Sequence, residues 1–260
     1  MNTLLSSEVL LETVVAAAQR AGNHALANHH RRHETILLAD HDVKLVLDVE
    51  CQKEAEAEIL ATYPDHAILG EEGQTSADSP YEWIIDPIDG TVNFHHGLPT
   101  WCCSIAVKVQ GEVVAGCVYL PMLNENYTAW NGSNTALLNG EPISVSQVGK
   151  INRALCVAGL GKPSDGSDAA LQGLNRVVKA ARHTRLHGVA AIDLVWVAAG
   201  RIDAYLDGGI YPWDYAAGAL IIEQAGGKVT YGKDFGDLSC QVFATNGLLH
   251  EEGLAVYHGT

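Results

Sequence analysis

Residues 83–94 read WIIDPIDGTVNF, and this stretch decides how the rest of the chain is interpreted. Its apolar start, Trp83 to Ile85, is typical of the end of a buried strand. A proline follows Asp86 and restricts both its own backbone and that of the residue before it. Asp86 and Asp89 are therefore held stiffly where the strand ends. Two carboxylates that face one small volume repel each other unless a cation lies between them.

Carboxylate oxygens in such a place suit Mg²⁺, which takes one or two carboxylates together with substrate phosphate oxygens. Gly90 and Thr91 follow at the expected start of a helical turn, where free backbone N–H groups favour an anion. The stretch therefore predicts a metal site beside a phosphate site. The alternative is an ordinary Asp-Gly turn, because both residue types are common in turns.

Two further acidic stretches bear on this choice. Gly70-Glu71-Glu72-Gly73 follows a short apolar strand and is either a second ligand stretch or a solvated turn. Asp214 opens an expected helix over residues 214–226, where its side chain is suited to cap the first turn. Capping does not exclude metal binding. The small residues after Asp214 allow the helix to pack close to a neighbour, which would bring Asp214 to the carboxylates of the first half.

Composition sets the class of protein. The 260 residues carry 16 basic and 31 acidic side chains, a net charge of −15, with 47% apolar residues. This balance argues against nucleic acid or an anionic membrane as a partner. No apolar run approaches a membrane span, and the charged start of a signal peptide is missing, so we expect a cytoplasmic protein. The six cysteines show no metal-site spacing and are expected to be reduced thiols.

The pattern of elements predicts two parts. Residues 1–150 predict helices near 7–32 and 48–63 and an antiparallel sheet that includes a hairpin over 101–119. Residues 151–260 alternate strands with helices, which is typical of an α/β unit. We therefore expect an N-terminal α+β part, 1–150, and a C-terminal α/β part, 151–260.

Taken together, the three acidic stretches resemble the inositol monophosphatase family of Mg²⁺-dependent phosphatases, which is related to the fructose bisphosphatases. Residues 83–94 resemble the first family signature nearly letter for letter, and residues 213–227 resemble the second. Gly70-Glu71-Glu72 resembles the upstream glutamate motif, in the expected order. The resemblance covers nearly the whole chain. It implies a layered α-β-α-β-α sandwich of the inositol monophosphatase and sugar phosphatase type, and a homodimer.

The resemblance also implies roles for individual residues. Two or three Mg²⁺ ions per site are implied, and the implied metal ligands are Glu71, Asp86, the carbonyl of Ile88, Asp89 and Asp214. The implied substrate contacts are Asp89, Gly90, Thr91, Arg185, Gly188, Ala190 and Asp207. Thr91 and Glu71 would orient the attacking water, and Asp207 would contact substrate hydroxyls.

The chain departs from the family pattern at several places. Glu50 stands where the family usually carries an aspartate that bonds to the motif threonine, so Glu50 is the third expected catalytic residue. Leu47 and Ala39 replace a usual threonine and a usual lysine, which bears on the number of metal ions. Lys162 replaces a serine on the substrate side. It either favours a second anionic group on the substrate or is a solvated loop lysine.

The expected function is hydrolysis of a small phosphomonoester by metal-activated water, without a covalent intermediate. Myo-inositol 1-phosphate is the leading substrate, since a carboxylate such as Asp207 accepts hydrogen bonds from paired hydroxyls. Histidinol phosphate and other sugar or nucleotide phosphates are alternatives. A different class is a non-catalytic protein that binds Mg²⁺ and phosphate ligands in a regulatory role.

Overall fold

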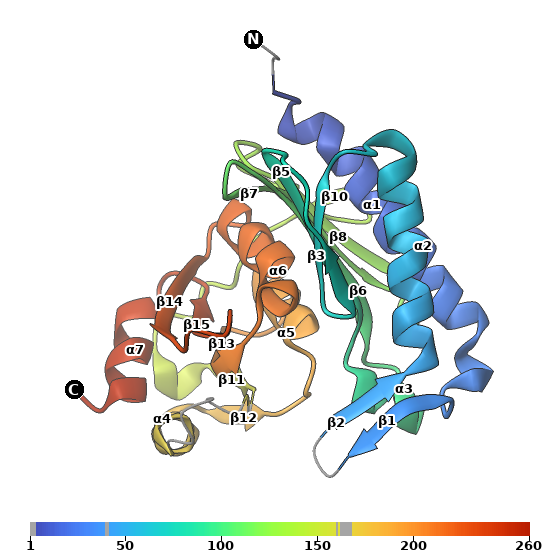
Figure 1. Cartoon of the computed structure of the whole chain (residues 1–260). Helices are drawn as coiled ribbons and strands as arrows, with labels where there is room; N and C mark the ends of the chain where they lie inside the picture. The colour runs from blue at the N-terminus through green and yellow to red at the C-terminus, as the bar shows by residue number, and fades with distance from the viewer. Residues whose placement is uncertain (1–3, 40–41, 160, 162–167) are drawn as a thin grey trace.

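The computed structural model describes residues 4–39, 42–159, 161 and 168–260. Five layers stack across the chain, with helices and sheets in alternation (Figure 1). Helices form the first, third and fifth layers in pairs: α1 (Ser7–Ala27) with α2 (Val46–Thr62), α5 (Ala190–Ala198) with α6 (Pro212–Gln224), and α4 (Ala169–Ala180) with α7 (His250–His258). This arrangement confirms the expected α-β-α-β-α sandwich.

The larger sheet has the strand order β10-β9-β8-β7-β6-β5-β3-β4. Its strands are β3 (Ala67–Gly70), β4 (Gly73–Thr75), β5 (Tyr81–Asp89), β6 (Cys102–Val109), β7 (Glu112–Leu120), β8 (Glu125–Trp130), β9 (Ala136–Leu138) and β10 (Glu141–Ile143). Neighbouring strands run antiparallel except β3 and β5, which are parallel. The expected hairpin is formed by β6 and β7. Its two-residue turn, Gln110-Gly111, has positive φ at both positions, as the right-handed twist of a hairpin favours.

The smaller sheet has the strand order β12-β11-β13-β15-β14. Its strands are β11 (Leu155–Ala158), β12 (His183–Arg185), β13 (Ala204–Ile210), β14 (Lys228–Asp234) and β15 (Cys240–Thr245). Strand β11 is parallel to β12 and β13, whereas β15 is antiparallel to β13 and β14. The chain passes from one sheet to the other between residues 143 and 155, near the expected change at 150. The division of the chain into an N-terminal part, 1–150, and a C-terminal part, 151–260, stays a prediction.

The remaining elements lie at the edges of these layers. They are the hairpin of β1 (Thr35–Ala39) and β2 (Asp42–Leu45), the short helix α3 (Thr91–His96), and 3₁₀ turns η1 (His29–Arg31) and η2 (Ile151–Arg153). Across the described residues, every helix is too short or too polar to cross a bilayer. All six cysteines are buried free thiols, as expected.

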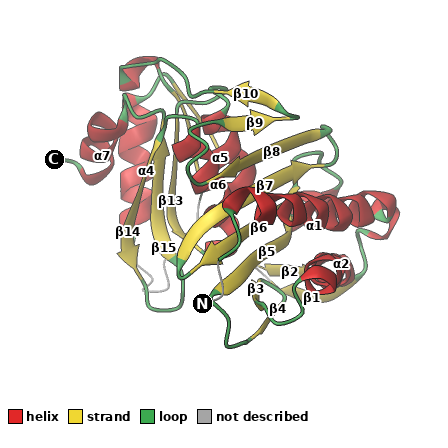
Figure 2. Cartoon of the chain, turned by 90° about the horizontal axis from the view of Figure 1, so that it is seen from above, coloured by secondary structure: helices red, strands yellow, loops and turns green. Residues whose placement is uncertain are grey.

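Apolar side chains fill the space between the layers in three clusters, one for each pair of helices. Figure 2 shows α1 and α2 on one face of the larger sheet and α5 and α6 on the other. Helix α6 lies very close to β7, because a Cβ atom placed on Gly116 would lie only 3.0 Å from the Cα atom of Ala217. The small residues of α6 therefore allow the close packing that the sequence predicted, and this packing sets the position of Asp214.

Candidate active site

A bulge near the end of β5 turns two carboxylates to the same face of the larger sheet. Strand β5 continues to Asp89 rather than ending at Ile85, but its register with β6 shifts, so that Asp86 pairs with Ser104 and Asp89 with Cys102. In a regular strand, residues three apart point to opposite faces. The extra residue of a bulge restores the alternation. Both aspartates consequently face the middle helix layer.

Asp214 reaches the same place from the start of α6. The helix begins at Pro212, two residues earlier than expected, and Asp214 occupies its third position. One carboxylate oxygen of Asp214 accepts a hydrogen bond of 2.7 Å from the backbone N–H of Tyr211. Asp214 thus caps its helix, as the sequence predicted, and still faces the larger sheet.

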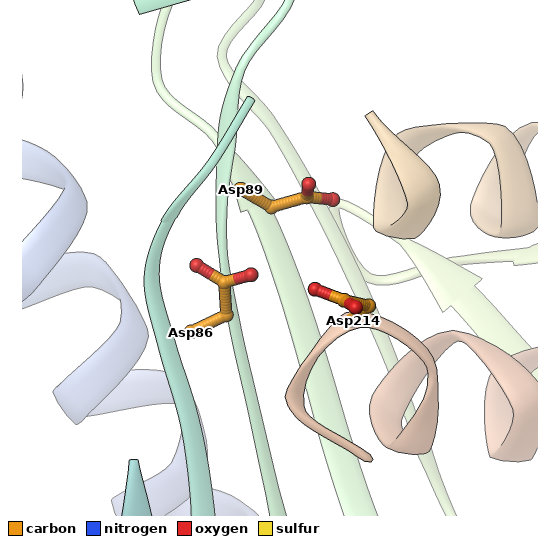
Figure 3. Close-up of side chains that lie close together, drawn as sticks. All are labelled: Asp86, Asp89 and Asp214. Atoms are coloured by element: carbon orange, nitrogen blue, oxygen red, sulfur yellow. The ribbon is translucent and has the colours of Figure 1, made fainter. Parts of the chain in front are cut away.

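Asp86, Asp89 and Asp214 each offer a carboxylate oxygen such that the three atoms lie within 4.8 Å of one another. Figure 3 shows the three side chains converging, two from β5 and one from the helix that faces it. Asp86 is 1% exposed and Asp89 is 8% exposed. The prediction that carboxylates from the two halves of the chain meet is therefore confirmed.

Burial and mutual repulsion raise the pKa of every member of this cluster. The pKa of Asp86 is raised first by desolvation and then by the charges of Glu71, Asp89 and Asp214. The pKa of Asp214 is raised by desolvation and by Asp89. The pKa of Asp89 is raised to about 7 by desolvation, against the opposing effect of a hydrogen bond from the Ala191 backbone.

The cluster fits a hard divalent cation. Oδ1 of Asp86 is fully buried and has no hydrogen-bond partner, which is costly for a carboxylate oxygen that no cation compensates. Three carboxylates also supply the hard oxygen ligands that Mg²⁺ prefers. These residues would hold such an ion, whose charge would remove the repulsion between them.

Glu71 lies beside this cluster in the turn between β3 and β4. Its charge raises the pKa values of Asp86 and Asp89. The turn is fixed by Gln52 of α2, whose side chain accepts a hydrogen bond of 2.8 Å from the Glu72 N–H and donates one of 3.1 Å to the Gly73 carbonyl. The turn is therefore anchored to the helix rather than free in solvent.

The expected phosphate turn is closely packed. Gly90 precedes α3 with φ of +91°, and a Cβ atom there would lie 2.7 Å from a methyl carbon of Val189. Only glycine meets both requirements without strain. The hydroxyl of Thr91 donates a hydrogen bond of 3.1 Å to the carbonyl of Ile88, the backbone oxygen expected to bind a metal.

Three of the expected substrate residues from the C-terminal half, Gly188, Ala190 and Asp207, line the same cavity as Asp89 and Asp214. This cavity of about 330 Å³ is lined by Asp89, Gly159, Gly161, Gly188, Val189, Ala190, Asp193, Tyr205, Asp207, Ile210 and Asp214. Asp207 is 4% exposed and accepts hydrogen bonds from the Gly161 and Gly209 N–H groups and the Tyr205 hydroxyl.

One expected substrate residue of the C-terminal half is placed differently. Arg185 is exposed on β12, where its guanidinium donates to the Thr184 carbonyl, and it does not belong to the described lining of the cavity. Lys162 lies outside the described residues.

Glu50 does not make the contact with Thr91 that the sequence suggested. Both of its carboxylate oxygens accept hydrogen bonds of 2.9 Å from Arg31, and His24 lies 3.1 Å from one of them. These partners, Arg31 first, lower the pKa of Glu50 to about 2. Residues two apart on a helix point in nearly opposite directions, so another residue of α2 faces the site.

That residue is Asp48, which the sequence interpretation missed. It is 2% exposed, and its Oδ2 accepts a hydrogen bond of 2.7 Å from the Leu45 N–H. Its Oδ1 is buried without a partner. Desolvation, followed by the charges of Glu71 and Glu72, raises the pKa of Asp48 to about 8 despite that hydrogen bond. The signal was present in the sequence, because Asp48 shares a helical face with the apolar positions three and seven residues later.

The chain matches the model of the inositol monophosphatase family over residues 6–256. It is 40% identical over 217 residues to a fructose-1,6-bisphosphatase/inositol-1-monophosphatase of Thermotoga maritima, covering 83% of this chain and 82% of that protein. It is 36% identical over 245 residues to a Nus factor SuhB of Xylella fastidiosa, covering 90% and 88%. The crystal structure of the extragenic suppressor protein suhB from Bartonella henselae matches it with a TM-score of 0.88 at 31% identity, over 96% of this chain and 98% of that one. The chain belongs to the inositol monophosphatase family.

Proposed function

We propose that this protein is a Mg²⁺-dependent phosphatase that releases phosphate from a small phosphomonoester, with myo-inositol 1-phosphate as the leading substrate. The observation that carries the proposal is the meeting of Asp86, Asp89 and Asp214, whose carboxylate oxygens lie within 4.8 Å of one another. Asp89 and Asp214 line the same cavity as Asp207. A metal cluster and a polyol contact on one cavity suit a phosphorylated alcohol.

Glu71, Asp86, the Ile88 carbonyl, Asp89 and Asp214 would hold two or three Mg²⁺ ions. Bound there, the ions would lower the pKa of water and neutralise the charge that grows on the transferred phosphoryl group. The burial of Asp86 and Asp89 fixes the positions of these carboxylates before substrate arrives. No serine or cysteine nucleophile is required, so the reaction proceeds without a covalent intermediate.

The other residues orient the substrate and move a proton. The backbone N–H groups at the start of α3, next to Gly90 and Thr91, would receive the phosphate. We assign to Asp48 the role first expected of Glu50. A buried carboxyl whose pKa is raised to about 8 and which has an unpaired oxygen suits proton transfer near neutral pH.

The cavity favours a small substrate. Its volume of about 330 Å³ lies at the lower end of ligand sites, which span roughly 300–1,000 Å³. Its described lining carries carboxylates and no lysine or arginine, which supports a single phosphate and a polar, uncharged or cationic remainder. Histidinol phosphate is therefore the strongest alternative to the inositol ester.

The test compares phosphate release from four esters with and without Mg²⁺: myo-inositol 1-phosphate, histidinol phosphate, fructose 1,6-bisphosphate and adenosine 3′,5′-bisphosphate. We expect Mg²⁺-dependent release, fastest with the inositol ester. If histidinol phosphate is hydrolysed fastest, the substrate assignment changes to that ester, and the proposal that the protein is a phosphatase stands. Absence of release from all four would remove the catalytic proposal.

A second function is favoured by one observation, the name Nus factor SuhB carried by several relatives, including one 36% identical to this chain. It is a regulatory role in which the same cavity binds Mg²⁺ and a phosphorylated ligand. Calorimetry with Mg²⁺ and inorganic phosphate identifies this case, because ligand binding without turnover of any ester would favour it over catalysis.

A further inference from the structure

The side chains of His187 and Asp193 form a pair beside the metal cluster that none of the roles above uses. Nδ1 of His187 lies 2.6 Å from Oδ1 of Asp193, which is 1% exposed. The His187 ring also packs edge-on against Trp196, with ring centroids 5.3 Å apart. The pair joins the residue before Gly188 to the first turn of α5. It therefore closes the intervening backbone, residues 187–193, into a loop.

This loop lies against the stretch that carries the phosphate turn. The Asn93 side-chain amide donates a hydrogen bond of 3.0 Å to the His187 carbonyl. Val189 packs so closely on Gly90 that the glycine cannot gain a side chain without a clash. The loop and the phosphate turn therefore contact each other at two places, the Asn93–His187 hydrogen bond and the packing of Val189 on Gly90.

A third contact reaches a metal ligand. The backbone N–H of Ala191 donates a hydrogen bond of 2.6 Å to Oδ2 of Asp89. Helix α5 has Val189 as its N-cap residue, which provides no side-chain cap, and Gly188 just before it has φ of +73°. The start of α5 is therefore held by tertiary contacts and by the His187–Asp193 pair rather than by a local cap.

We propose that the His187–Asp193 pair is a positioning element for the metal site. By closing the loop onto α5, the pair keeps the Ala191 N–H directed at Asp89 and so fixes the carboxylate for the ion. Hydrogen-bond partners of metal ligands orient those ligands and strengthen binding. The inference rests on the proposed function, because it requires that Asp89 binds Mg²⁺.

The test measures Mg²⁺ affinity of the metal-free protein by calorimetry. His187→Phe keeps a ring against Trp196 but removes the donor, and Asp193→Leu removes the acceptor. We expect each to weaken Mg²⁺ binding about tenfold, the lower end of the range for such outer partners. The double variant should bind no more weakly than either single one, because both substitutions break the same contact.

Asp193→Asn separates the hydrogen bond from the charge. It removes the same negative charge as Asp193→Leu but keeps an oxygen acceptor in the same place. We expect its Mg²⁺ affinity to stay near that of the parent protein. An affinity as weak as that of Asp193→Leu would show that charge alone matters, and the positioning role would be wrong.

Matched controls lie in the same half of the chain, away from the cavity. Asp203 is a buried aspartate that accepts a hydrogen bond of 2.7 Å from the Leu155 N–H, and His250 is a buried histidine that bonds to Thr230 and Thr245. Asp203→Leu and His250→Phe should lower the thermal midpoint of the metal-free protein without changing Mg²⁺ affinity.

The outcomes are distinct. If the His187 and Asp193 variants lose thermal stability like the controls and bind Mg²⁺ like the parent, the pair is structural only and the inference is overturned. His187→Leu, which also removes the donor, provides the same comparison should His187→Phe not fold. If the parent protein itself binds no Mg²⁺, the proposed function is overturned and this inference with it, whereas normal binding by the parent and by the His187 and Asp193 variants overturns this inference alone.

Discussion

The backbone N–H of Ala191 donates a hydrogen bond of 2.6 Å to the carboxylate of Asp89, a residue 102 positions earlier in the chain. This contact joins the start of a helix in the C-terminal part to the end of a bulged strand in the N-terminal part. The partial positive charge of a helix start stabilises a carboxylate, which opposes the effect of burial on Asp89. The candidate metal site is therefore built from both parts of the chain.

Substituting Asp86 by asparagine should reduce phosphate release by a factor on the order of 10²–10³, the range seen when one preorganised electrostatic group is removed. The metal-free protein should keep or raise its thermal midpoint, because one buried like charge is lost. Steady-state assays and thermal unfolding check both. Asp65→Asn, on an exposed aspartate, should change neither. Unchanged turnover in the Asp86 variant would contradict the site.

Substitutions of the two α2 carboxylates Asp48 and Glu50 should differ strongly in their effect on kcat. Asp48→Asn is expected to lower kcat by about 10²–10⁴, the range for loss of a positioned acid or base. Glu50→Gln should leave kcat near that of the parent, since its carboxylate binds Arg31 at the surface of α1 and α2. Each of the two variants therefore serves as the control for the other. A large loss of kcat in the Glu50 variant would restore the original assignment.

Gly90→Ala should lower the free energy of unfolding far more than Gly111→Ala does, although φ is +91° at Gly90 and +90° at Gly111. A Cβ atom at Gly111 meets nothing within 4 Å, so only the backbone cost of about 1–2 kcal/mol applies. At Gly90 the clash with Val189 adds overpacking of about 1–3 kcal/mol. Chemical denaturation measures the difference. An equal loss of unfolding free energy in the two variants would show that the Val189 side chain moves aside without cost.

The metal-free protein should become less stable as pH rises from 5 to 9. The pKa values of Asp89 and Asp48 are raised to about 7 and about 8, above the value of about 4 for an unfolded aspartate. Folding therefore favours their protonated forms, and that contribution is present below about pH 4 and is lost as pH rises through 7 and 8.

Added Mg²⁺ should reverse this trend, because the ion binds the ionised carboxylates. The rise in thermal midpoint caused by Mg²⁺ is expected to be larger at pH 8 than at pH 5. Asp48→Asn should flatten the metal-free pH profile. A metal-free midpoint that climbs steadily from pH 5 to 9 would show that these carboxyls are not held in their protonated forms.

The sequence by itself identified the carboxylates of the candidate metal site, and the family resemblance of the stretches that carry them implied the layered fold. Asp86, Asp89 and Asp214 lie in stretches whose chemistry is local, a strand end with a proline and a helix start with an aspartate. Small residues after Asp214 indicated the close packing on Gly116 that brings the halves together. These features depend on neighbours within a few residues, so they can be recognised from the local sequence.

Only the tertiary structure decided which side chains face the site. Asp48 and Glu50 differ by two positions, and the choice between them depends on which face of α2 meets the sheet and which meets Arg31. The bulge that aligns Asp86 with Asp89 is set by pairing with β6, and the bond from Ala191 to Asp89 joins residues 102 positions apart in the sequence. The helical spacing of Asp48 indicates the face of α2 on which it lies, but no local pattern indicates the register of β5 with β6 or the bond from Ala191, because both depend on the packing of distant elements.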